Sequence, residues 1–397
     1  MQQRNDFEEA THQQLSMADR QQRLRELAIV FLRLGTFAFG GPAAHIAMMD
    51  EEVVERRKWL SREKLLDLLG VTNLIPGPNS TELAIHIGYE RAGWLGLITA
   101  GACFILPAFL MVWLLAFLYV QYQTTPQLGW LLYGVKPVIL AVVAQALWKL
   151  SQKALKDRVT WATAIAVAGL SWLGLNEILL LLLAGLAILV LKGWRHLSDR
   201  PLWPIPLLLA QVSTRAVAEV PHSWQVFWVF LKIGSVLYGS GYVLLAFLQK
   251  ELVERLQWLT SQQILDAVAI GQFTPGPVFT TATFVGYLVA GNSGAIAATI
   301  GIFLPAFVLV ALINPYATRL RRSPLTSALL DGVNAASLGL MAVVTLKLAT
   351  AAVVDWLTVT LAIASVVAAF KFRVNSTYLV LAGGLIGWIA QNFNLVG

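Results

Sequence analysis

The chain has 397 residues, of which 57% are hydrophobic and 13% are charged, and its mean hydropathy is +0.67. Soluble proteins are about 45–50% apolar and about 25% charged, so this composition excludes a soluble globular enzyme and predicts a polytopic membrane protein. The net charge of +7 fits basic cytoplasmic loops in a lipid bilayer, and we expect no nucleic-acid partner. The single cysteine, Cys103, excludes an intrachain disulfide and a cysteine metal cage.

A polar, glutamine-rich tail at residues 1–23 opens the chain and lacks the pattern of a signal peptide. Two copies of one unit follow, which we place at 24–196 and 225–397 with a linker at 197–224. Eleven of the thirty-one residues from 31 to 61 are identical to their partners 199 positions later, and beyond the middle of each copy the offset becomes 198. This similarity indicates a duplicated unit.

Each copy contains six apolar segments in the same order, which predicts an all-α fold. In the first copy they span 24–48, 62–90, 93–120, 127–150, 158–174 and 176–193. In the second they span 224–248, 262–290, 292–314, 326–349, 354–371 and 376–393.

Glycine and proline interrupt the first two segments of each copy. The interruptions are Gly40-Gly41-Pro42 and Pro76-Gly77-Pro78 in the first copy, and Gly239-Ser240-Gly241 and Pro275-Gly276-Pro277 in the second. Proline removes a backbone donor and clashes inside a helix, so the second segment is a broken helix or a re-entrant hairpin. Irregular backbone at membrane depth persists only where protein or a water-filled cavity satisfies it.

Basic residues occupy opposite sets of loops in the two copies. Because short basic loops favour the cytoplasm, equivalent loops lie on opposite sides, which predicts inverted-topology repeats. Five spans and one re-entrant hairpin per copy give about ten transmembrane helices with both termini outside. The alternative is six spans per copy with a thirteenth in the linker.

Two cations occupy equivalent positions deep in apolar segments, Arg33 and Lys232. Ionisable residues at such depth are costly and mark functional sites, and this pair would frame an anion near the midplane. Alternatively, each extends to the membrane surface or pairs with Asp67 or Asp266.

Small polar residues follow each Pro-Gly-Pro. They are Asn79, Ser80 and Thr81 in the first copy, and Thr280 and Thr281 in the second. A helix that restarts there presents free N–H groups and a positive dipole end, which with the hydroxyls suits an oxyanion. The alternative is a simple kink.

Some candidates occur in one copy only. Glu82 and His86 are four residues apart and share a helical face, where they would carry a coupling proton, although either one is also placed to meet Arg91 or the membrane surface. Lys136 aligns with Asn334, and it either lines a pathway or extends to the surface. The five histidines form no metal-binding cluster, so we expect no metal or other cofactor.

Several motifs resemble chromate transporters of the two-domain, long-chain class. They are F-x-R-x-G-x-x-x-F-G-G-P-x-x-H at 31–45, E-x-V-x-R-x-x-W-L-S at 52–61, the Pro-Gly-Pro, and G-Y-x-x-A-G at 88–93. The resemblance implies chromate efflux and chromate resistance. It also implies functional roles for the residues that match the family's motifs, which are Arg33, Gly40, Gly41, Pro42, Pro76, Gly77, Pro78, Gly276 and Pro277. The second copy departs from the pattern because it lacks the proline of the first break.

These observations favour a secondary active transporter that exports chromate across the cytoplasmic (inner) membrane of the cell, rather than an enzyme. Sulfate or another oxyanion is the alternative substrate, an anion channel is the alternative mechanism, and a homodimer stays open. Nucleotide-binding and hydrolase motifs are missing from the sequence, so the energy must come from an ion gradient or the membrane potential.

Overall fold

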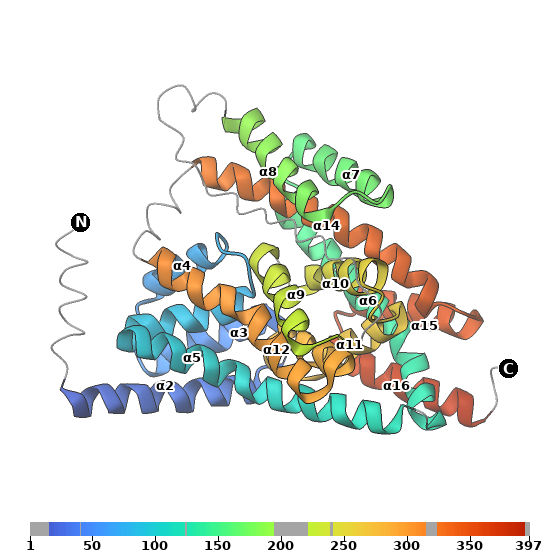
Figure 1. The fold of residues 1–397 in the computed structure, drawn as a ribbon, viewed down its shortest axis with the longest axis horizontal. Helices are drawn as coiled ribbons and strands as arrows, with labels where there is room; N and C mark the ends of the chain where they lie inside the picture. Colours follow the sequence, from blue (N-terminus) through green and yellow to red (C-terminus); the bar gives the residue numbers. More distant parts are fainter. Residues whose placement is uncertain are drawn as a thin grey trace.

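The computed structural model describes residues 16–39, 41–123, 125–193, 221–238, 241–314 and 324–393. These ranges contain helices and no strand, which confirms the all-α prediction (Figure 1). The predicted tail and linker lie largely outside them, as do Gly40, Gly239 and Ser240.

The first repeat contains α2 (Met17–Phe37), α3 (Gly41–Met49), η1 (Asp50–Arg56), α4 (Arg62–Thr72), α5 (Asn79–Tyr122), α6 (Pro126–Ala154), α7 (Arg158–Trp172) and α8 (Glu177–Gly193). The second contains α9 (Ser223–Val236), η3 (Gly241–Val243), α10 (Leu244–Leu248), η4 (Gln249–Arg255), α11 (Ser261–Phe273), η5 (Val278–Thr280), α12 (Thr281–Ile313), α14 (Pro324–Ala352), α15 (Trp356–Phe370) and α16 (Ser376–Asn392).

Both repeats contain the same unusual helical turn after the first break. The turns η1 and η4 are π-helical, so their backbone hydrogen bonds join residues five apart instead of four apart as in an α-helix. Each is followed closely by a residue with positive φ, Lys58 at 52° and Gln257 at 54°. The recurrence of this irregular backbone shows that the two copies share one local fold as well as a sequence pattern.

The long helices α5 and α12 are each folded back on themselves. The backbone leaves helical geometry at Ala92-Gly93 in α5 and at Ala290-Gly291 in α12. A Cβ atom on Gly88 would lie 2.6 Å from the Cβ of Ala100, although residues twelve apart in a straight helix are separated by about 18 Å. The chain therefore reverses between the second and third predicted apolar segments, and small residues let the two arms approach closely.

Four helical regions in the described part are long and apolar enough to cross a membrane. They are Asn79–Tyr122, Pro126–Ala154, Val278–Ile313 and Leu325–Ala352. Together with the many large apolar side chains left exposed on the outer faces, they indicate an integral membrane protein. The number of crossings and the inverted topology stay predictions.

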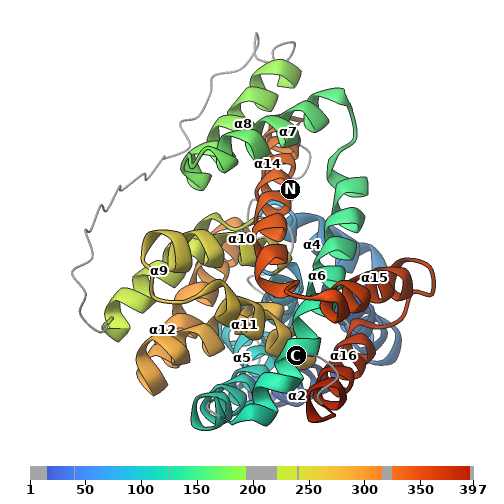
Figure 2. The ribbon, with the colours of Figure 1, turned by 90° about the vertical axis from the view of Figure 1, so that its right-hand side faces the viewer.

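The helices form two bundles that each combine both repeats (Figures 1 and 2). The hairpin bundle comprises residues 17–122 and 223–313, and the exchanged bundle comprises residues 126–193 and 324–392. In the exchanged bundle α6 packs against α15 and α16 of the other repeat, whereas α14 packs against α7 and α8. Glycine allows this close packing, because a Cβ on Gly134 would lie 2.7 Å from the backbone nitrogen of Gly387.

Candidate functional site

The two Pro-Gly-Pro breaks contact each other's repeat through reciprocal hydrogen bonds. The Gly77 N–H donates to the Leu237 carbonyl (N···O 2.8 Å), and the Gly276 N–H donates to the Ala38 carbonyl (3.0 Å). Ala38 and Leu237 are equivalent residues that end α2 and α9. A contact in which each copy gives the other the same donor and acceptor indicates a pseudo-two-fold arrangement. Both breaks therefore lie at the centre of the hairpin bundle.

The central glycines have backbone conformations and neighbours that leave no space for a side chain. Their φ values are +140° at Gly77 and +90° at Gly276, which L-residues with a Cβ rarely adopt. A Cβ on Gly276 would lie 2.7 Å from the Cβ of Ala108 in α5. A Cβ on Gly77 would overlap Oε1 of Glu82 and would lie 3.5 Å from the Cβ of Ala306 in α12. The breaks thus bring both repeats into close backbone contact.

A buried polar cluster adjoins the first break, and Glu82 is its central residue. The Glu82 side chain is fully buried in the first turns of α5, and neither carboxylate oxygen has a hydrogen-bond partner among the described residues. The nearby hydroxyl of Thr81 is likewise buried and unpaired in this part of the chain. Tyr238, which follows Leu237, is close enough to Glu82 to interact with it electrostatically. A buried ionised carboxylate needs partners to offset its loss of hydration, and the described residues provide none for Glu82.

Two buried histidines lie near the first break. His45 lies in α3, where its Nδ1 is 3.2 Å from the Ser80 hydroxyl and its Nε2 is 3.1 Å from the Ala38 carbonyl. His86, one turn beyond Glu82, has its Nδ1 3.0 Å from Oδ1 of Asn314 at the end of α12, while its Nε2 has no partner in the described ranges. The structure therefore places Glu82 and His86 on one inward face, as their spacing predicts, and adds His45.

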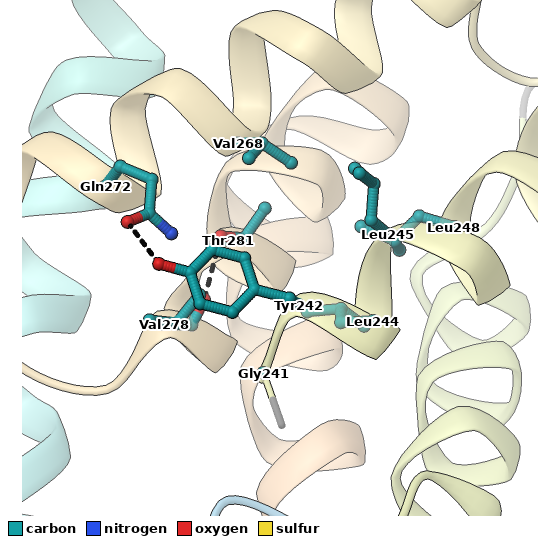
Figure 3. Close-up of a pocket in the computed structure, with 9 residues that line it drawn as sticks. All are labelled: Gly241, Tyr242, Leu244, Leu245, Leu248, Val268, Gln272, Val278 and Thr281. Atoms are coloured by element: carbon teal, nitrogen blue, oxygen red, sulfur yellow. Dashed lines mark hydrogen bonds between the residues drawn. The ribbon is translucent and has the colours of Figure 1, made fainter. Parts of the chain in front are cut away.

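The second break is more apolar than the first. Its threonines donate back to their own turn, from Thr280 to the Pro277 carbonyl (2.7 Å) and from Thr281 to the Val278 carbonyl (2.8 Å). Beside them Tyr242 donates to Oε1 of Gln272 at 3.2 Å (Figure 3). A small cavity opens here with room for about one water molecule. Its lining residues are Gly241, Tyr242, Leu244, Leu245, Leu248, Val268, Gln272, Val278 and Thr281.

The remaining predicted residues at the first break have mixed positions. Pro76 and Pro78 are buried, and so are Pro275 and Pro277 of the second break. The Asn79 side-chain amide donates to Oδ1 of Asn73 at 2.8 Å near the surface. Gly41 has φ +76° and with Pro42 starts α3, while Gly40 lies outside the described residues.

The two predicted cations have different surroundings. Arg33 is exposed on α2 and makes no ion pair or hydrogen bond within the described ranges. Lys232 binds the buried carboxylate of Glu251 (Nζ···O 3.1 Å), which also pairs with Arg255. The partner of Lys232 is therefore neither of the aspartates considered from the sequence, because the π-helical turn brings Glu251 back to α9.

A third buried charge centre was not predicted from the sequence as a unit. Asp266 of α11 lies 3.4 Å from Nζ of Lys136 in α6 and accepts a 2.9 Å hydrogen bond from the Tyr119 hydroxyl. Lys136 also donates to Gln262. The sequence does show a lysine, Lys136, inside an apolar segment of one copy, with Asn334 as its counterpart in the other. It does not show that α11 lies opposite this lysine.

Comparison with known proteins gives a consistent result. The family model described as "Chromate transporter" matches residues 25–189 and again residues 224–388. The chain is 33% identical over 381 residues to the chromate transport protein of Cupriavidus metallidurans, a match that covers 92% of this chain and 93% of the relative. It is 33% identical over 378 residues to the chromate transport protein of Pseudomonas aeruginosa, covering 90% of each chain. It is also 32% identical over 328 residues to a probable chromate transport protein of Synechococcus elongatus, covering 80% of this chain and 83% of the relative. No solved structure matches the chain significantly.

Proposed function

The chain belongs to the chromate transporter family, and on that premise we propose that it is a secondary transporter that exports chromate across the cytoplasmic (inner) membrane and so gives chromate resistance. The observation that carries this proposal is the reciprocal contact between the two buried helix breaks. Discontinuous helices that meet at a repeat interface are where secondary transporters bind their substrates.

The substrate would be a tetrahedral dianion bound between the breaks. In the first repeat the N–H groups of Asn79 and Ser80 begin α5 and have no acceptor within the helix, and the unpaired hydroxyl of Thr81 adds a donor. The Ser80 hydroxyl would have to turn from His45 toward the anion. In the second, Thr280 and Thr281 would turn their hydroxyls from their own carbonyls toward the anion. The N–H groups of Gly77 and Gly276 are already bonded, so they hold the breaks together instead.

Access to this site requires the two bundles to move. The described cavity at the second break holds about one water molecule, which is too small for chromate, so this cavity would have to widen to admit the anion. Inverted repeats would permit alternating access if the two breaks separate within the hairpin bundle, first on one side and then on the other, as that bundle rocks against the exchanged bundle. An open anion channel is the alternative mechanism, and sulfate, a tetrahedral dianion like chromate, is the alternative substrate.

Radiotracer uptake into inverted membrane vesicles tests this function. We expect saturable chromate uptake that competes with sulfate and increases with an imposed proton gradient. Vesicles without the protein supply the background. Unsaturable uptake that ignores the gradient would favour the channel, and preferred accumulation of sulfate would change the assigned substrate. If the chromium inside the vesicles has a changed oxidation state, the protein also reduces its substrate and is not a transporter alone.

Arg33 and Lys232 provide a second test, because they are proposed to offset the charge of the anion from equivalent positions. Arg33→Ala is expected to weaken apparent chromate affinity by about ten-fold, equivalent to ~1.4 kcal/mol. Lys232→Ala should have at least this effect, because it also removes a partner of buried Glu251. Lys371→Ala in a loop is the control and should leave affinity unchanged. Normal uptake by both variants at normal expression would refute the paired-cation hypothesis.

A further inference from the structure

Equivalent helices of the two repeats have opposite environments. Asp266 and Leu265 of α11 are buried, whereas their counterparts Asp67 and Leu66 of α4 are exposed, Leu66 by 56%. The difference arises because α11 packs against α6, α14 and α16 of the exchanged bundle, while α4 packs on α5 and η1. The hairpin bundle therefore docks on the exchanged bundle through its second repeat, and among the described residues nothing covers the matching surface of its first repeat.

Charged residues for a second docked arrangement are present in the first repeat. In the second repeat Glu254 of η4 and Lys347 of α14 form an ion pair of 2.8 Å that joins the two bundles. The equivalent residues are Glu55 of η1 and Lys149 of α6, so both the acid and the lysine recur. Glu55 instead pairs with Arg62 at 2.7 Å, and Lys149 is exposed without an ion pair in the described part of the chain.

We propose that the chain adopts a second conformation in which α4 and η1 dock on the exchanged bundle and Glu55 pairs with Lys149. This inference deepens the proposed transport cycle and rests on it. In the second conformation Glu254 leaves Lys347, Asp266 leaves Lys136, and Asp67 turns toward Asn334. The two conformations are the pseudo-symmetric ends of one rocking motion, and each covers one of the two equivalent docking surfaces, α11 or α4.

Burial and charge together support this exchange. Docking α4 would cover Leu66 as docking α11 covers Leu265, so apolar surface that becomes exposed in one repeat is matched by apolar surface that becomes buried in the other. In the present structure Gln262 donates to the Ala351 carbonyl of α14 at 3.1 Å. The equivalent residues of the first repeat are Glu63 and the exposed Lys153 of α6, which would approach each other in the second conformation. The exchange is unequal, because Asn334 replaces the lysine of the Lys136–Asp266 pair. We therefore expect the conformation described here to be the more populated one in the absence of substrate.

Cysteine cross-linking tests the proposal without any substrate. In a Cys103→Ser background, the pair Glu254→Cys and Lys347→Cys should cross-link with a short bis-methanethiosulfonate reagent, which spans the length of a lysine–glutamate ion pair and attaches to each cysteine through a disulfide. The pair Glu55→Cys and Lys149→Cys should cross-link more slowly, and Glu55→Cys with Lys347→Cys, which meet in neither conformation, is the matched control. Each cross-link should reduce chromate flux by about ten-fold or more, and reductant should restore it.

The outcomes separate this inference from the proposed function. Cross-linking of the 55–149 pair at the control rate, while the 254–347 pair reacts fully, would overturn the second conformation even if chromate is transported. Cross-linking of both pairs without chromate flux would support the two conformations and refute the substrate. Should the cysteine variants fail to fold, the double charge reversal Glu55→Lys with Lys149→Glu provides a second measurement. It should restore the flux that either single reversal lowers, and equal loss in all three would contradict the ion pair.

Discussion

Replacing Gly276 with alanine is expected to reduce chromate flux by about ten-fold or more, because the change affects both the backbone and the packing between the repeats. The φ of +90° costs an L-residue ~1–2 kcal/mol, and the added Cβ would lie 2.7 Å from the Cβ of Ala108. Ala108 is buried inside the second arm of α5, so the break itself would have to move. The Gly276 N–H would then lose its hydrogen bond to the Ala38 carbonyl.

Gly169→Ala is the matched control for this prediction. Gly169 lies inside α7, and a Cβ there would meet nothing within 4 Å. Alanine at that position should keep full flux and raise helix stability by up to ~1 kcal/mol. Flux in vesicles and the melting temperature in detergent measure both variants. Normal flux by the Gly276 variant would show that the reciprocal backbone contact is dispensable for transport.

The sequence predicts the local features of this fold because their causes are local. The combined proline, glycine and proline at 76–78 and at 275–277 interrupt the helix in both copies, and the duplicated pattern predicts that both copies share one fold. The four-residue spacing of Glu82 and His86 likewise determines a common face in any helix.

The arrangement of the helices was not predictable in the same way. An apolar helix in a membrane is apolar on every side, so its sequence does not show which helix it packs against. Helix α6 packs against α15 and α16 of the other repeat instead of α7 and α8 of its own. This packing depends on close approaches such as that of Gly134 to Gly387, and in the sequence each of these glycines is only one small residue among many. Lys232 pairs with Glu251 because a π-helical turn changes the direction of the chain. The spacing of apolar residues in the sequence does not predict that turn.

Glu82→Gln is expected to remove the proton-gradient drive while leaving the anion site intact. The Glu82 side chain is fully buried beside Gly77 without a partner in the described residues, so we expect it to be neutral in this conformation. Opening the repeat interface would expose the carboxyl to water, where it can ionise. Each cycle would therefore take up and release one proton at this residue, and glutamine, neutral and of the same shape, cannot do so.

Two measurements distinguish loss of coupling from loss of structure in this variant. Chromate accumulation driven by a proton gradient should fall about ten-fold, while exchange of labelled for unlabelled chromate stays within about two-fold of the original. Glu90→Gln on the same arm, whose carboxylate pairs with Lys64 at 3.1 Å, is the control and should keep both activities. If both activities of the Glu82 variant fall together, Glu82 serves the structure of the break; if the gradient still drives accumulation, the coupling proton binds elsewhere.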